Sequence, residues 1–143
     1  MKKTLTIFAA LLFLGSSLTV FGEDVRKASF VLVEFYPAKL QSMVPIEAIF
    51  VIKNTGNAPI NPYAEVTLSG RVVTLKGDEV LRIVDKKYYV HNLWPGETTG
   101  KQRLYIGSVP SGEYTLELTV NAYNKVRGQN LSTEMVSFSL KIS

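Results

Sequence analysis

Apolar and polar side chains alternate along nearly every segment after Lys27, in short runs that are separated by Gly, Pro and Asn. A period of two residues places the apolar side chains on one face of a β-strand, whereas an amphipathic helix repeats about every 3.6 residues. No run of this chain shows the helical repeat. The sequence therefore predicts an all-β protein in which most strands bury one face.

Individual strands can be located from this alternation. Residues 114–120 and 134–142 show it most clearly, and residues 46–53 are the best candidate for a central strand because part of their second face is also apolar. Residues 29–36 end at Pro37, which cannot donate a ladder hydrogen bond, so we expect an edge strand there. About seven to eight short strands of this kind favour two packed antiparallel sheets.

Turns are expected where Gly, Asn and Pro interrupt the alternation. Residues 53–59, KNTGNAP, predict a turn in which Gly56 takes a positive φ, and residues 76–79, KGDE, predict a hairpin turn. Pro95 and Gly96 predict a further turn. These turns separate short strands at the spacing that is typical of an antiparallel sandwich.

The remaining segments give one further strand, one long loop and one ambiguous stretch. Gly70 is expected to close a strand at residues 63–69, and residues 121–131 are expected to form a loop. Residues 86–94 remain ambiguous, and their end leads into the turn at Pro95 and Gly96.

Composition removes most enzyme chemistries. The chain has no cysteine and one histidine, which excludes disulfides, a thiol nucleophile, cysteine-based metal sites and a histidine cluster. Hydrophobic residues make up 46% and charged residues 20%, a balance that suits a folded domain rather than a disordered chain. No cofactor is expected.

The N-terminal segment resembles a secretory signal peptide at residues 1–22. Two lysines precede an apolar stretch at residues 5–14, and smaller residues follow up to Gly22. We expect cleavage after Gly22, a single domain at residues 23–143, and a secreted, periplasmic or cell-envelope location. The alternative is an uncleaved N-terminal anchor, because the uncharged stretch is long enough to span a bilayer. That anchor would be the only expected contact with a membrane.

Net charge argues against nucleic-acid binding. The formal charge of +4 falls to +2 once the two lysines of the leader are removed. The remaining basic residues are scattered or lie near acids, whereas nucleic-acid-binding domains usually carry a basic stripe. These residues are expected to be ordinary solvated side chains.

Three motifs resemble those of immunoglobulin-like and fibronectin type III-like sandwiches, in particular the CARDB (cell-adhesion-related) group of exported bacterial proteins. They are FVIKNTGNAPI at residues 50–60, LWPGE at residues 93–97 and SGEYTLELTV at residues 111–120. The resemblance covers almost all of residues 23–143 and implies an immunoglobulin-like antiparallel β-sandwich. It also implies that the Tyr114 hydroxyl bonds the backbone of the preceding corner.

The chain departs from the CARDB pattern in two places. Residues 124–132, NKVRGQNLS, lack the acids of the usual turn before the last strand, which weakens any expectation of cation binding, and residues 72–89 are longer than in compact members. A weaker resemblance is to the intracellular proteinase inhibitor family, although the export signal argues against it.

Candidate catalytic groups are few. His91 is the one available imidazole, and no G-x-S-x-G sequence is present to offer a nucleophilic serine. Glu113 and Glu117 share one polar face of one strand, which is typical of solvated surface rather than of a glycosidase pair. We expect the protein not to be an enzyme.

One short segment is a candidate ligand or partner surface. Tyr88, Tyr89, His91 and Trp94 fall close together beside Lys86 and Lys87, and aromatic side chains near basic groups are enriched at binding interfaces. Alternation sends Tyr88 and Tyr89 to opposite faces of a strand. Whether Trp94 lies in the core or on the surface stays open, because sandwiches of this size usually bury their one Trp.

The expected function is that of a non-enzymatic exported binding or structural module that contacts a protein or a cell-envelope component through its loops or an edge strand. The alternative is a carbohydrate-binding module that stacks sugar rings on Tyr88, Tyr89 or Trp94.

Overall fold

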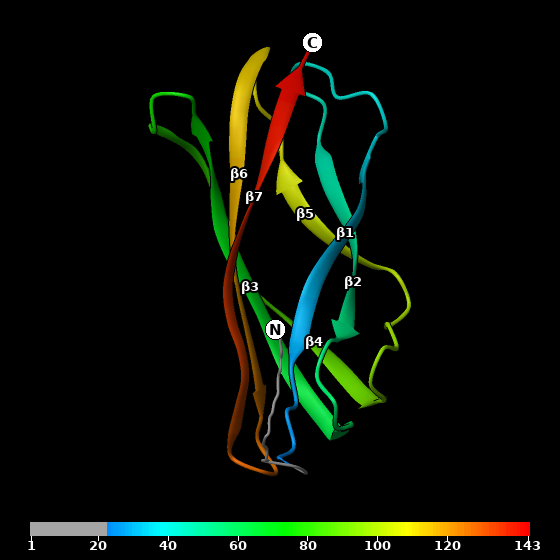
Figure 1. Cartoon of the computed structure of the whole chain (residues 1–143). Helices are drawn as coiled ribbons and strands as arrows, with labels where there is room; N and C mark the ends of the chain where they lie inside the picture. The colour runs from blue at the N-terminus through cyan, green and yellow to red at the C-terminus, as the bar shows by residue number, and fades with distance from the viewer. Residues whose placement is uncertain (1–22) are drawn as a thin grey trace, which may run out of the picture.

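The computed structural model describes residues 23–143, which form seven strands in two antiparallel sheets (Figure 1). This confirms the predicted all-β sandwich, while the expected signal segment at residues 1–22 lies outside the described residues. None of the described residues forms a helix long and apolar enough to cross a membrane. The strands are β1 (Ala28–Tyr36), β2 (Ile46–Asn54), β3 (Ile60–Thr74), β4 (Glu79–Leu93), β5 (Gln102–Gly107), β6 (Gly112–Asn124) and β7 (Gln129–Ile142).

The smaller sheet has the strand order β1-β2-β5. The predictions that residues 46–53 form a central strand and residues 29–36 an edge strand are both confirmed. Phe50 points into the core from β2, whereas Ile49 and Val51 point to the outer face, which explains why the second face of this strand is apolar in its middle.

The larger sheet has the order β4-β3-β6-β7, with strands of 13 to 15 residues. The ambiguous segment at residues 86–94 forms most of the second half of β4. Gly70 does not close a strand, because β3 continues to Thr74. A Cβ atom at Gly70 would lie 2.1 Å from the Glu117 carbonyl oxygen, so glycine at this position allows β3 and β6 to approach closely.

The core lies between the sheets and is built from the inward residues of the alternating strands. Phe30 of β1 stacks on Phe50 of β2 with ring centroids 4.9 Å apart. Leu116 and Leu118 of β6 face them from the larger sheet and are fully buried. Burial of side chains of this size is the main stabilising contribution here, because the chain has no disulfide.

The turn after β2 is fixed by a buried asparagine rather than by a positive φ at Gly56. The side-chain amide of Asn54 donates to the carbonyl oxygens of Ala58 and Leu93, at 3.0 and 2.9 Å, and its oxygen accepts from the Gly56 N–H at 2.9 Å. Gly56 is absent from the positive-φ glycines of residues 23–143, and a Cβ there would lie 2.0 Å from the Val25 carbonyl oxygen. The glycine is therefore needed for close packing.

The implied tyrosine corner is present. The Tyr114 hydroxyl donates to the Pro110 carbonyl oxygen at 2.9 Å, just before β6. The expected loop at residues 121–131 is shorter than predicted, because β6 extends to Asn124 and β7 begins at Gln129. Asn124 is fully buried, and both ends of its side-chain amide are satisfied. The amide nitrogen donates to the Asn61 carbonyl oxygen, and the amide oxygen accepts from the Arg127 N–H, so this polar residue can end a strand in the core.

Two side chains of the larger sheet reach the backbone of the smaller one at its open edges, and we call them the edge clasps. The Glu134 carboxylate on β7 accepts the Phe30 N–H of β1 at 2.8 Å. On the opposite side, the Tyr88 hydroxyl on β4 donates to the Arg103 carbonyl oxygen of β5 at 2.8 Å. The edge clasps therefore join the two sheets at places where no ladder of backbone hydrogen bonds connects them.

Candidate functional site

The four residues of the predicted surface divide between the inside and the outside of the sandwich. Tyr88 faces the core, whereas Tyr89 and His91 are exposed on the outer face of β4, as the alternation predicted. Trp94 lies in the turn after β4 and is 59% exposed, so this tryptophan belongs to the surface and not to the core.

Tyr88 is part of the packing. Its ring meets the Phe50 ring edge-on, with centroids 5.1 Å apart, and its hydroxyl forms one of the edge clasps. Burial raises the pKa of Tyr88 above its ordinary value. A ring held in this way offers no free face to a ligand.

Tyr89 and His91 share the outer face of the larger sheet with two further tyrosines, of which Tyr63 lies next to both of them. The Tyr63 ring on β3 lies 6.2 Å from Tyr89 and 5.9 Å from His91, measured between centroids. Tyr123 on β6 joins them, because Glu65 pairs in register with Tyr89 on one side and with Tyr123 on the other. We call Tyr63, Tyr89, His91 and Tyr123 the aromatic cluster.

Glu65 lies at the centre of the aromatic cluster and is nearly buried. Its carboxylate pairs with Lys87 at 3.3 Å and Lys125 at 3.7 Å, and accepts the Tyr89 hydroxyl at 3.3 Å. Burial acts to raise the pKa of Glu65, but the hydrogen bond and charge of Lys87, the charge of Lys125 and the Tyr89 hydroxyl together lower it. Glu65 thus stays ionised and holds the Tyr89 ring in place.

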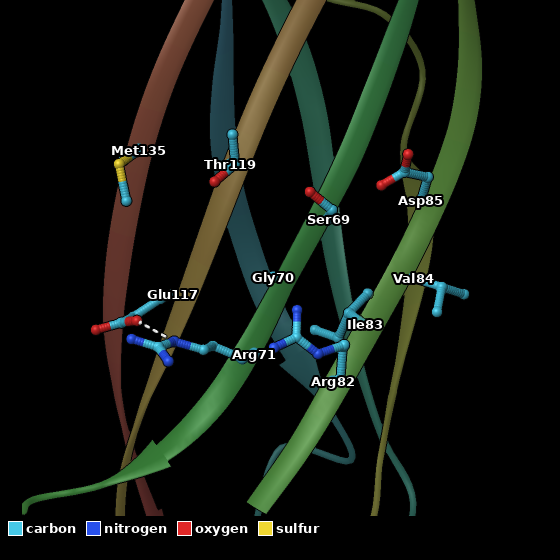
Figure 2. Close-up of a pocket in the computed structure, with 10 residues that line it drawn as sticks. All are labelled: Ser69, Gly70, Arg71, Arg82, Ile83, Val84, Asp85, Glu117, Thr119 and Met135. Atoms are coloured by element: carbon cyan, nitrogen blue, oxygen red, sulfur yellow. Dashed lines mark hydrogen bonds and ion pairs between the residues drawn. The ribbon is translucent and has the colours of Figure 1, made fainter. Parts of the chain in front are cut away.

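A shallow depression of about 690 Å³ continues along the same face from β4 to β7, and we call it the outer trough. Figure 2 shows Ser69 and Thr119 on its floor, where they pair in register between β3 and β6. Met135 of β7 lines one side, and Asp85 of β4 lines the other. Its lining residues are Ser69, Gly70, Arg71, Arg82, Ile83, Val84, Asp85, Glu117, Thr119 and Met135.

A β-bulge in β4 shapes one wall of the outer trough. Leu68 pairs with Lys86, but Gly70 pairs with Ile83, so β4 has one extra residue opposite Ser69. Bulges bend a strand and redirect its side chains. Figure 2 shows Asp85 pointing back toward Ser69, which adds a carboxylate to this wall.

The charges of the outer trough are balanced. Arg71 pairs with Glu117 at 2.9 Å, and Arg82 pairs with Glu79 at 2.6 Å just outside the lining. The lining itself contributes two guanidinium groups and two carboxylates, with the hydroxyls of Ser69 and Thr119 between them. The outer trough therefore offers hydrogen-bond donors and acceptors without a strong net charge.

Metal ligands do not gather in the part of the chain that the structure describes. Across residues 23–143, no group of three or more His, Asp, Glu or Cys side chains is placed to hold a metal ion.

Sequence reasoning identified Tyr89 and His91 but not their neighbours. Tyr63 and Glu65 share the parity of the outward positions in their strand, so alternation alone could have placed them outside. Tyr123 fell in the expected loop. The register that brings β3, β4 and β6 together is not encoded locally.

Comparison with solved structures returns β-sandwich domains at low sequence identity. The chain is similar to the CARDB domain of a Pyrococcus furiosus protein, solved in complex with di-metal ions, with 16% identity, a TM-score of 0.48 and coverage of 87% of this chain and 97% of that one. It is also similar to a cohesin module of a Clostridium perfringens family 33 glycoside hydrolase, with 16% identity, a TM-score of 0.43 and coverage of 84% and 98%.

A third similar structure is an ASH/PapD-like domain of a human protein, with 13% identity, a TM-score of 0.45 and coverage of 93% of this chain and 96% of that domain. No protein-family model and no curated protein sequence matches the chain. A CARDB domain is therefore among the solved structures that this chain resembles, in line with its sequence motifs, and the fold assignment rests on the two sheets themselves.

Proposed function

We propose that this protein is a non-enzymatic, exported binding module that holds a protein or cell-envelope component on the outer face of its larger sheet. The observation that supports this best is the outer trough, which lies on the same face as the aromatic cluster. Export is supported by the signal-like segment at residues 1–22.

The face suits binding for physical reasons. Its side chains stand on four long paired strands, so the backbone beneath a ligand is already ordered and loses little conformational entropy on binding. Tyr89 and Tyr123 are 55% and 43% exposed, and exposed tyrosines that are fixed from below are typical interface anchors. Tyr89 is fixed through its hydrogen bond to Glu65.

The absence of catalysis is part of the proposal. His91 lies against the Tyr63 ring, whereas a base in a catalytic triad needs a carboxylate on one side and a nucleophile on the other. The carboxylate of Glu117 in the outer trough is engaged by Arg71. A carboxylate held in this way is less available to a reacting group, which suits a structural role more than general acid catalysis.

Site-specific photo-crosslinking in the native envelope tests the proposal. A photoreactive residue in place of Tyr89 or Thr119 should yield a discrete adduct, whereas the same residue in place of Tyr105, on the outer face of the smaller sheet, should not. Adducts formed only at position 105, or turnover of a hydrolase substrate panel that is lost in His91→Ala, would reject it.

Mass spectrometry of the native protein tests the export step. We expect the mature chain to begin at Glu23. Retention of residues 1–22 on a membrane-associated product would instead support the N-terminal anchor.

A further inference from the structure

We propose that the outer trough and the aromatic cluster together bind a neutral polysaccharide chain. This rests on the proposed function and names the ligand class of that same face.

Charge balance within the outer trough favours a neutral ligand, whereas at the aromatic cluster Lys87 and Lys125 share the single carboxylate of Glu65. The Arg71 guanidinium is already paired with Glu117, and the Arg82 guanidinium contacts both carboxylate oxygens of Glu79, at 2.6 and 3.1 Å. An anionic ligand would have to displace these carboxylates and would also meet Asp85. A hydroxyl group needs no such exchange, because it can use the donors and acceptors that the pairs leave free.

The floor matches a ligand that is rich in hydroxyl groups. Ser69 and Thr119 pair across β3 and β6, and the next outward pair toward the aromatic cluster is Thr67 with Asn121. Hydroxyl and amide side chains both donate and accept hydrogen bonds, as sugar hydroxyls do. A peptide would instead need its backbone N–H and C=O groups satisfied, which an open strand edge does better than a sheet face.

The length of the face suits a chain of several sugar rings. Glu65, under the aromatic cluster, and Arg71, at the other end of the outer trough, are six residues apart on β3, which corresponds to roughly 20 Å of strand. A monosaccharide would use only part of this surface.

The aromatic cluster supplies the apolar contact. Tyrosine presents a flat apolar body with a polar tip, which suits the alternating apolar and polar surfaces of a sugar ring. Because the Tyr89 hydroxyl is bound to Glu65, the ring is ordered before a ligand arrives. Tyr88, which is packed in the core, and Trp94, which lies in a turn, are not part of this platform.

Affinity electrophoresis and calorimetry of the purified protein provide the test. The probes are a soluble mixed-linkage β-glucan, a galactomannan and, as a charged polymer, polygalacturonate. We expect at least one neutral polymer to bind and polygalacturonate not to. Tyr89→Ala should weaken this binding by roughly tenfold, the loss typical of an anchor residue, and Thr119→Arg should weaken it by filling the trough.

Tyr105→Ala is the matched control, because Tyr105 is 56% exposed against 55% for Tyr89 but lies on the opposite outer face. It should bind like the wild type, and so should Trp94→Ala. Thermal unfolding of each variant separates lost binding from lost folding. A folded Tyr89→Ala variant with wild-type affinity, or preferred binding of polygalacturonate, would overturn the inference.

The two proposals fail in different ways. If no neutral polymer binds, but photo-crosslinking through position 89 or 119 yields a defined protein adduct, the polysaccharide inference is rejected and the proposed function stands. If neither a polymer nor a crosslinked partner depends on this face, both are rejected.

Discussion

Tyr89 and Tyr105 lie on opposite outer faces of the sandwich and are almost equally exposed, but their surroundings differ. Around Tyr105, the smaller sheet covers its own apolar centre. Arg103 pairs with Glu47 and stands over the Tyr36 ring, with 5.7 Å between the guanidinium carbon and the ring centroid. Ile49 lies beside Arg103 in register and is only 5% exposed although it points outward.

Around Tyr89, the polar groups lie in the floor and leave the surface above them open. Glu65 is nearly buried beneath the rings, and the outer trough crosses the same face farther along β3, at Ser69 to Arg71. Exposure of an aromatic residue therefore does not by itself identify a binding face. What distinguishes the two faces is that the Arg103 guanidinium of the smaller sheet stands over the Tyr36 ring, whereas the larger sheet has the outer trough above its paired strands.

Among the substitutions of Ile49, Glu65 and Arg103, that of Ile49 should have the largest effect on stability. We expect Ile49→Ala to lower the free energy of unfolding by about 2 kcal/mol, because the residue is buried despite its outward position. Thr119→Ala on the open face should change it by less than about 0.5 kcal/mol. Urea unfolding measures both values, and equal losses would mean that the two faces are covered alike.

Replacing Glu65 should have an intermediate effect that depends on pH. Because the folded-state pKa of Glu65 is lowered from 4.5, the folded state binds fewer protons than the unfolded state in this range. Its contribution is therefore present above pH 4.5 and lost as the pH falls through the folded-state pKa. Glu65→Gln should melt below the wild type at pH 7, with a gap that narrows on acidification.

A pH series of thermal melts from 7 to 3 measures that gap. Arg71→Gln, which disrupts an exposed ion pair on the same sheet, is a suitable control. A gap between wild type and Glu65→Gln that stays constant over the series would contradict the assigned role of Lys87 and Lys125.

Of the substitutions of Ile49, Glu65 and Arg103, that of Arg103 should have the smallest effect. Arg103→Ala removes an exposed ion pair with Glu47 and part of the cover over Ile49, so we expect a loss of about 0.5 kcal/mol or less in the free energy of unfolding. The measurement is again urea unfolding, at low and high salt. A loss as large as that of Ile49→Ala would show that the ion pair, rather than burial, closes this face.

Much of the fold could be predicted because period-two alternation is a local signal. It located the inward residues of β2 and β6 and placed Tyr88 and Tyr89 on opposite faces. It failed at strand ends, where Asn54 and Asn124 are polar but fully buried. Their side chains form hydrogen bonds with backbone groups of the neighbouring loops. An asparagine, which by its residue type predicts a loop, therefore fixes the end of a strand at both positions.

The candidate site could be predicted only in part, because it is assembled across strands. Tyr89 and His91 come from one segment, whereas Tyr63 and Tyr123 come from strands whose register is set by pairing distant in sequence. The outer trough also depends on a bulge in β4, and no local motif marked that extra residue.

The Glu134 edge clasp has a consequence for how this domain behaves among its own copies. A strand edge with free N–H groups is a template on which another chain can add. In β1, the Phe30 N–H is occupied by a carboxylate from the neighbouring sheet, so an incoming strand would have to displace a charged acceptor before it could pair. The same contact that joins the sheets thereby disfavours strand addition at this point of the edge.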